Sequence, residues 1–130
     1  MKDLEDKIMH DDVTTISELK KAVHALCLKK GWGGESGIQN PQHVAMAMTV
    51  EMSELLEHFQ WLNIENVQAL LDGKDEKRKC KIAEEFADVM MYGLQLMWSL
   101  DIDIAHEIEK KIDIVLKRDA SWKADMIPHT

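Results

Sequence analysis

Residues that build turns are scarce in this sequence, which holds six glycines and two prolines among 130 residues. An all-β domain of this length consists of many short strands joined by turns, and it would need more of both. Aromatic residues amount to only 5%, whereas methionine, which favours helices over strands, occurs nine times. The composition therefore argues against a β-sandwich and predicts a single all-α domain.

Positive charge is in short supply as well. The chain has 16 lysines and arginines against 24 aspartates and glutamates, for a net charge of −8. A surface of this sign repels phosphate backbones, so we expect no nucleic-acid partner. A small anionic ligand would need a cation between itself and the protein.

Long apolar runs are missing and cysteine is rare. No stretch of about 18 apolar residues is present, so we expect no membrane-spanning helix. Residues 1–6 carry too much charge for a signal peptide. The two cysteines, Cys27 and Cys80, fall within stretches of helical spacing, and a helical domain of this length needs no disulfide. We therefore expect reduced thiols and a cytoplasmic protein.

What the sequence does contain is helical periodicity, with apolar residues recurring every three or four positions. A capping box at Thr15 and an Asn40-Pro41 pair mark the starts of the first two long helices, and Asp103 caps the last. The expected helices span about 15–30, 41–62, 75–100 and 104–118, with a short helical turn within 63–74. Residues 1–13 form a loose N-terminal arm, residues 14–118 the helical domain, and residues 119–130 a C-terminal tail. Four such helices predict a four-helix bundle.

Four acidic residues stand where the helical pattern calls for apolar ones. Glu51 falls within the apolar stripe of the second long helix and Glu54 at its edge, and Glu85 and Asp88 repeat this arrangement on the third. Residues three apart on a helix are neighbours. Two helices are therefore each expected to point a pair of carboxylates toward the bundle interior.

A divalent cation resolves the repulsion among these four carboxylates, because a dry core cannot hold all of them ionised. A single Glu-x-x-Glu pair is usually a solvated helix face, but two inward pairs favour a metal site. Mg²⁺ prefers carboxylate oxygen and takes substrate phosphate as a further ligand. A di-iron site would use Glu-x-x-His motifs, and the nearest case here is Asp103-x-x-His106. We therefore expect Mg²⁺ rather than iron.

Several motifs together resemble one protein family. The motifs are Glu51-Met52-Ser53-Glu54-Leu55, Phe59-Gln60-Trp61 and Glu84-Glu85-Phe86-Ala87-Asp88-Val89. They resemble the MazG-like all-α nucleoside triphosphate pyrophosphohydrolases, and within these the dCTP pyrophosphatase branch. The resemblance covers roughly residues 14–118, which would make this range the catalytic domain.

The resemblance implies Mg²⁺-dependent cleavage of a nucleoside triphosphate, dCTP or a related dNTP, to the monophosphate and pyrophosphate. It implies that the four acids Glu51, Glu54, Glu85 and Asp88 bind the metal, and we expect Glu54 to act as general base. The dCTP pyrophosphatase branch packs the base against aromatic residues, which match Trp32, Trp61 and Tyr92. The family places cations of the last helix on phosphate, for which Lys111, Lys117 and Arg118 are the candidates. It also implies a homodimer or homotetramer whose sites are partly shared between subunits.

The sequence departs from the branch near its end, and other readings stay open. Val115 stands where the branch commonly has Asn, and Asp119-Ala120 where it has Tyr-Pro, which affects the phosphate contacts and the base preference. Trp61 fits a subunit interface as well as a base contact. The basic residues Lys77, Arg78, Lys79 and Lys81 are most simply a solvated turn, and His58 a partly exposed helix residue. The alternative to an enzyme is a non-catalytic helical module that binds metal or a protein partner.

Overall fold

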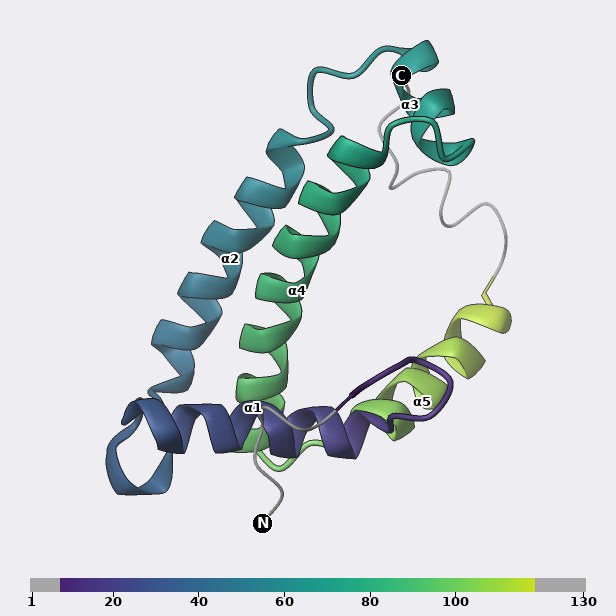
Figure 1. Cartoon of the computed structure of the whole chain (residues 1–130). Helices are drawn as coiled ribbons and strands as arrows, with labels where there is room; N and C mark the ends of the chain where they lie inside the picture. Colours follow the sequence, from purple (N-terminus) through teal and green to yellow (C-terminus); the bar gives the residue numbers. More distant parts are fainter. Residues whose placement is uncertain (1–7, 119–130) are drawn as a thin grey trace.

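The computed structural model describes residues 8–118, and this part of the chain is entirely helical, as predicted (Figure 1). It contains no strand between residues 8 and 118. The loose arm and the C-terminal tail fall mainly outside the described residues. The helices in chain order are α1 (Ile16–Lys30), the 3₁₀ turn η2 (Gly34–Ser36), α2 (Pro41–Glu57), α3 (Ile64–Leu71), α4 (Glu76–Ser99) and α5 (Ile104–Leu116).

Local caps explain where most of these helices begin. The Thr15 hydroxyl accepts a hydrogen bond from the Glu18 amide, and the Glu18 carboxylate accepts one from the Thr15 amide, so the predicted capping box is present. Asn40 caps α2 with Pro41 in its first turn, and Asp103 caps α5. α1 ends at Gly31, whose φ of 75° lies in the left-handed region that glycine tolerates.

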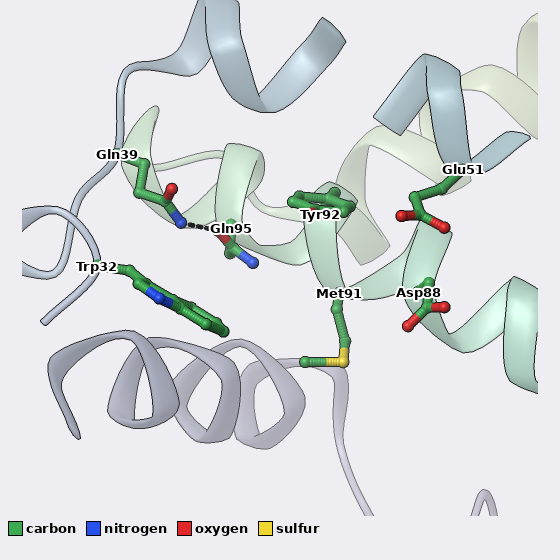
Figure 2. A pocket seen from close by; sticks show the side chains of 7 residues that line it. All are labelled: Trp32, Gln39, Glu51, Asp88, Met91, Tyr92 and Gln95. Carbon is green, nitrogen blue, oxygen red and sulfur yellow. Dashed lines mark hydrogen bonds between the residues drawn. The ribbon is translucent and has the colours of Figure 1, made fainter. Parts of the chain in front are cut away.

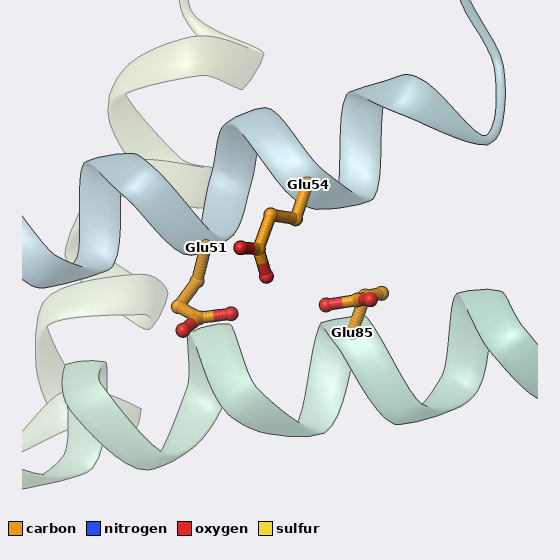
Figure 3. Close-up of side chains that lie close together, drawn as sticks. All are labelled: Glu51, Glu54 and Glu85. Carbon is orange, nitrogen blue, oxygen red and sulfur yellow. The ribbon is translucent and has the colours of Figure 1, made fainter.

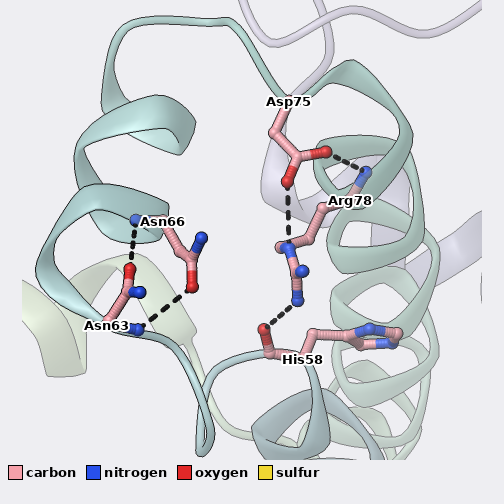
Figure 4. Close-up of polar contacts among 5 residues, drawn as sticks. All are labelled: His58, Asn63, Asn66, Asp75 and Arg78. Carbon is pink, nitrogen blue, oxygen red and sulfur yellow. Dashed lines mark hydrogen bonds and ion pairs between the residues drawn. The ribbon is translucent and has the colours of Figure 1, made fainter.

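The prediction that the second long helix runs to Leu62 is wrong, because α2 ends at Glu57. The Phe59 amide bonds to the Leu56 carbonyl and the Leu62 amide to the Phe59 carbonyl, so the chain continues as tight turns. The side chains of Asn63 and Asn66 then cap α3 reciprocally (Figure 4). The early end places Trp61 in a turn instead of on the helical face shared with Glu54.

α2 and α4 lie side by side and form the centre of the fold, while α1 crosses one end of α4 (Figure 1). The most buried apolar side chains come from these three helices. They are Val23, Cys27, Val44, Val89 and Leu94. The core is therefore small and lies where α1 meets the α2–α4 pair.

α5 diverges from the α2–α4 pair, so a single chain does not show the expected four-helix bundle (Figure 1). The Lys20 ammonium donates to the Ile102 carbonyl at 2.8 Å and ties the α4–α5 connection to α1. Ile108 and Ile112 of α5, which lie four residues apart on one face, remain 51% and 55% exposed. The apolar face of α5 thus has no covering surface among residues 8–118.

No helix between residues 8 and 118 combines the length and the apolar character needed to cross a membrane.

Candidate functional site

The acidic residues of α2 and α4 converge where the two helices run alongside each other (Figure 3). Glu51, Glu54 and Glu85 each offer a carboxylate oxygen, and these atoms all lie within 4.8 Å of one another. The fourth acid, Asp88, stands beside Glu51 in an adjoining pocket and is exposed (Figure 2). Three of the four predicted acids therefore converge, and Asp88 adjoins them. Glu54 and Asp88 are exposed to solvent instead of pointing into a dry interior, because α2 and α4 are not enclosed by further helices of the described chain on this side.

Glu51 lies in an unfavourable environment for a charged carboxylate. Its Oε2 atom is buried and has no hydrogen-bond partner among residues 8–118. Burial raises the pKa of Glu51 most, and the neighbouring carboxyl group of Glu54 raises it further. Repulsion by Glu54, Asp88 and Glu85 adds to the same shift. An orphaned carboxylate oxygen amid three other acids is the environment that a bound cation would relieve.

The donor set fits a hard divalent cation. All the candidate ligands are carboxylates, and no His or Cys joins the three-residue group found within residues 8–118. Oxygen-only coordination suits Mg²⁺, Ca²⁺ or Mn²⁺ and disfavours softer metals. Glu54 and Asp88 are exposed, so substrate oxygens and water can reach the same side of the cluster.

A pocket of about 400 Å³ opens directly beside the acids (Figure 2). Its lining residues are Trp32, Gln39, Glu51, Asp88, Met91, Tyr92 and Gln95. A volume of this size lies within the range of small-molecule sites. Trp32 and Tyr92, two of the three predicted base contacts, face this pocket, so one cavity combines aromatic surface with carboxylates.

Sequence reasoning missed two polar residues of this pocket, Gln39 and Gln95. The Gln39 Nε2 atom donates to Gln95 Oε1 at 2.8 Å, which joins the α2 approach to α4 (Figure 2). Gln39 also hydrogen-bonds the Cys27 thiol, whose pKa is raised mainly by burial. Gln95 lies seven residues after Asp88, on the same helical face, and this spacing was the available signal. The sequence offered no such signal for Gln39, because this residue lies before α2 begins.

Trp61 does not line the pocket in a single chain. It lies in the turn after α2 and is 86% exposed. Its predicted contact with a base therefore stays a prediction, whereas Trp32 and Tyr92 line the pocket.

The three cations predicted to bind phosphate belong to the end of the chain that diverges from the acids. Lys111 borders an apolar groove between α4 and α5, and Lys117 forms an ion pair with Asp113 at 2.8 Å. Arg118 follows α5. The structure of one chain does not bring these residues to the pocket, so their phosphate contacts stay a prediction.

A second set of charged residues, at the start of α4, lies closer to the acids than the cations of α5 do. The His58 Nε2 atom lies 3.8 Å from Glu85 Oε1. Arg78 donates through Nη1 to the His58 carbonyl at 3.2 Å, which holds the end of α2 against the start of α4 (Figure 4). Arg78 is therefore a structural link and is not part of a solvated turn.

Comparison with known proteins connects this site to a family. The MazG-like family matches residues 46–126, a range that includes all four acids. Neither the curated proteins nor the solved structures gave a match. Members of this family are generally nucleoside triphosphate pyrophosphohydrolases that use divalent metals. Since the match covers more than half of its length, the chain belongs to the MazG-like family.

Proposed function

We propose that this protein hydrolyses a deoxynucleoside triphosphate, dCTP or a related dNTP, to the monophosphate and pyrophosphate with Mg²⁺. One observation carries the proposal: three carboxylates converge within 4.8 Å beside a pocket lined by Trp32 and Tyr92. Family membership supports the general reaction class. The resemblance of the acid motifs to the dCTP pyrophosphatases supports the finer substrate assignment.

Each part of the site has a distinct task in this reaction. Glu51, Glu54, Glu85 and Asp88 would hold Mg²⁺, which supplies Lewis-acid stabilisation of the phosphates and lowers the pKa of bound water. Trp32 and Tyr92 offer aromatic faces on which a base stacks. The pocket thus orients the nucleoside, and the acids orient the triphosphate at its α-phosphorus.

The chemical step forms one bond and breaks one. A water oxygen bonds to the α-phosphorus, and the bond from the α-phosphorus to the α–β bridging oxygen breaks. Pyrophosphate leaves with that oxygen and its electron pair. We assign Glu54 as the group that takes the water proton, because its exposed carboxylate can pass the proton to solvent.

The active form is proposed to be a homodimer or a larger homo-oligomer. The exposed apolar face of α5 favours association, because an isologous contact buries such a face on both partners at once. A second subunit could bring Trp61, or the cations of α5, to a site that one chain leaves open.

The test is a panel of nucleoside and deoxynucleoside triphosphates incubated with the full chain and Mg²⁺, with products read by ³¹P NMR. The expected products are monophosphate and pyrophosphate. In H₂¹⁸O the label should enter the monophosphate, because water attacks the α-phosphorus.

The matched variants are Glu85→Gln, which should be inactive, and Glu84→Gln, which should be active. Glu84 is exposed on the same helix and lies outside the acid cluster. No pyrophosphate from any nucleotide, in a chain that still folds, would instead support the non-catalytic helical module.

A further inference from the structure

A cationic cavity lies one helical turn beyond the acids, at the start of α4. Its volume is about 260 Å³, and it is lined by His58, Asp75, Lys77, Arg78 and Lys81. The reaction proposed above gives this cavity no task. The pocket beside the acids lies toward the other end of α4, so the acids stand between the two cavities.

Two of the charged residues here already serve the fold. Asp75 accepts hydrogen bonds from the Arg78 amide at 3.2 Å and from Arg78 Nε at 3.1 Å (Figure 4). These bonds lower the pKa of Asp75 and keep it ionised. Arg78 in turn donates to the His58 carbonyl at 3.2 Å. Asp75 and Arg78 therefore form one side of the cavity, and their charges largely offset each other.

Lys77 and Lys81 differ from Arg78, because no carboxylate of the described chain lies within ion-pair distance of either ammonium group. Both are exposed and border the same cavity. The cavity therefore keeps a net positive charge, in a protein whose total charge is −8. That charge lies beside Glu85, since His58 lines the cavity and its Nε2 atom is 3.8 Å from Glu85 Oε1.

Helical spacing places the cations, the acids and the pocket in a row along one face of α4. Spacings of three or four residues keep side chains on one face of a helix. The row runs through Lys77, Lys81, Glu85, Asp88, Tyr92 and Gln95. A nucleoside triphosphate has the matching order, with the base at one end, the α-phosphate next and the β- and γ-phosphates at the other end.

We propose that Lys81, assisted by Lys77, binds the β- and γ-phosphates of the substrate and holds the pyrophosphate as it leaves. This inference rests on the proposed function, because it needs the base at Tyr92 and the α-phosphate at the acids. Fixed positive charge where the leaving group gains negative charge lowers the barrier of the step. The cavity supplies this charge within one chain, whereas the cations of α5 belong to a helix that diverges from the α2–α4 pair.

The test measures binding of inorganic pyrophosphate to the full chain by calorimetry in the presence of Mg²⁺. Lys81→Gln removes the charge and keeps most of the side-chain length. We expect it to raise the dissociation constant for pyrophosphate about tenfold, as for a lost charge-assisted hydrogen bond. Affinity for the nucleoside monophosphate should stay unchanged, and Lys81→Arg should restore most of the pyrophosphate affinity.

Lys79→Gln is the matched control, because Lys79 is exposed on the same turn of α4 but does not line the cavity. It should leave both affinities unchanged, and thermal unfolding should show that all variants fold. Equal pyrophosphate affinity in Lys81→Gln and Lys79→Gln would overturn the proposal. So would an equal loss of monophosphate and pyrophosphate affinity in Lys81→Gln, or no pyrophosphate binding by the unaltered chain.

Failure of the proposed function and failure of the phosphate site would give different results. A chain that cleaves no nucleotide, yet binds pyrophosphate in a Lys81-dependent manner, would refute the hydrolase and keep the phosphate site. A chain that cleaves nucleotides while Lys81→Gln behaves like Lys79→Gln would keep the hydrolase and refute the site.

Discussion

The α2–α4 pair and α5 differ in what each lacks within a single chain. α2 and α4 pack along their length and bring several carboxylates together. Among the described residues, the Glu51 Oε2 atom is buried and has no hydrogen-bond partner. α5 diverges from them and leaves Ile108 and Ile112 about half exposed.

The difference shows that the same helical periodicity can leave two kinds of incomplete surface. A cation relieves the repulsion among crowded carboxylates, because it supplies the opposite charge. An apolar helix face is relieved by another apolar surface, because removal from water is what stabilises it. A cation therefore suits the α2–α4 region, whereas a further apolar surface suits α5.

The largest effect is expected from removing one charge at the acid cluster. Asp88→Asn and Glu51→Gln should each lower the rate of nucleotide hydrolysis by at least about 100-fold, since loss of supporting groups around a metal alone costs up to that much. Steady-state pyrophosphate release measures the effect. Glu57→Gln, an exposed acid at the end of α2, is the control and should leave the rate unchanged. Near-normal rates in Asp88→Asn would remove that residue from the mechanism.

Addition of Mg²⁺ should stabilise the α2–α4 region strongly. A ligand that binds only the native state raises the free energy of unfolding by about 2.7 kcal/mol at a concentration 100 times its dissociation constant. Urea unfolding followed by tryptophan fluorescence, with and without MgCl₂ at constant ionic strength, measures the change. The gain should be absent in Glu51→Gln. An equal gain from a monovalent salt would count against a metal site.

The partner surface of α5 can be tested by charging its exposed apolar face. Ile112→Lys should raise the dissociation constant of the oligomer about tenfold or more, because a buried isoleucine contributes roughly 1.5–3 kcal/mol. Ile114→Lys is the matched control, since Ile114 is also exposed but lies on a different face of α5. Sedimentation at micromolar concentration measures the association of both variants. A monomer in the unaltered protein would refute the idea that a second copy covers α5.

A smaller effect is expected where the pocket meets α4. Gln95→Met keeps the shape of the side chain but removes its hydrogen bond with Gln39, so discrimination among bases should fall about fivefold, the worth of one hydrogen bond. Ratios of kcat/KM over a panel of dNTPs measure it. Gln42→Met, at an exposed position early in α2, serves as the control. If every dNTP slowed by the same factor, Gln95 would support the fold and not the choice of base.

The smallest effect concerns the pH dependence of the metal-free protein. Glu51 has a raised pKa, so the native state binds its proton more tightly than the unfolded chain does. The free energy of unfolding should therefore fall as the pH rises above 4.5, the usual value, and through the raised pKa. In EDTA, Glu51→Gln should show a shallower decline and greater stability at pH 7 than the unaltered chain. Glu84→Gln should follow the unaltered chain, and an unchanged slope in Glu51→Gln would contradict the assignment.

The sequence by itself determined the features that depend on a few neighbouring residues. Thr15, Asn40 and Asp103 start their helices through bonds to amides two or three positions away. The Glu51 and Glu54 pair shares a helical face because residues three apart are neighbours. Such relations need no knowledge of the remaining chain, so the helical class and each pair of acids could be read directly. The convergence of the acids depends on the packing of α2 against α4.

Tertiary structure alone decided the features that join distant segments. The Arg78 bond to the His58 carbonyl holds the chain where α2 has ended, and the Gln39 bond to Gln95 completes the pocket across 56 positions. The direction of α5 follows from the α4–α5 turn and from Lys20 on α1, 82 positions before its acceptor. Periodicity shows which face of a helix is apolar, but it does not show what covers that face. The covering surface depends on contacts whose geometry exists only once the chain has folded.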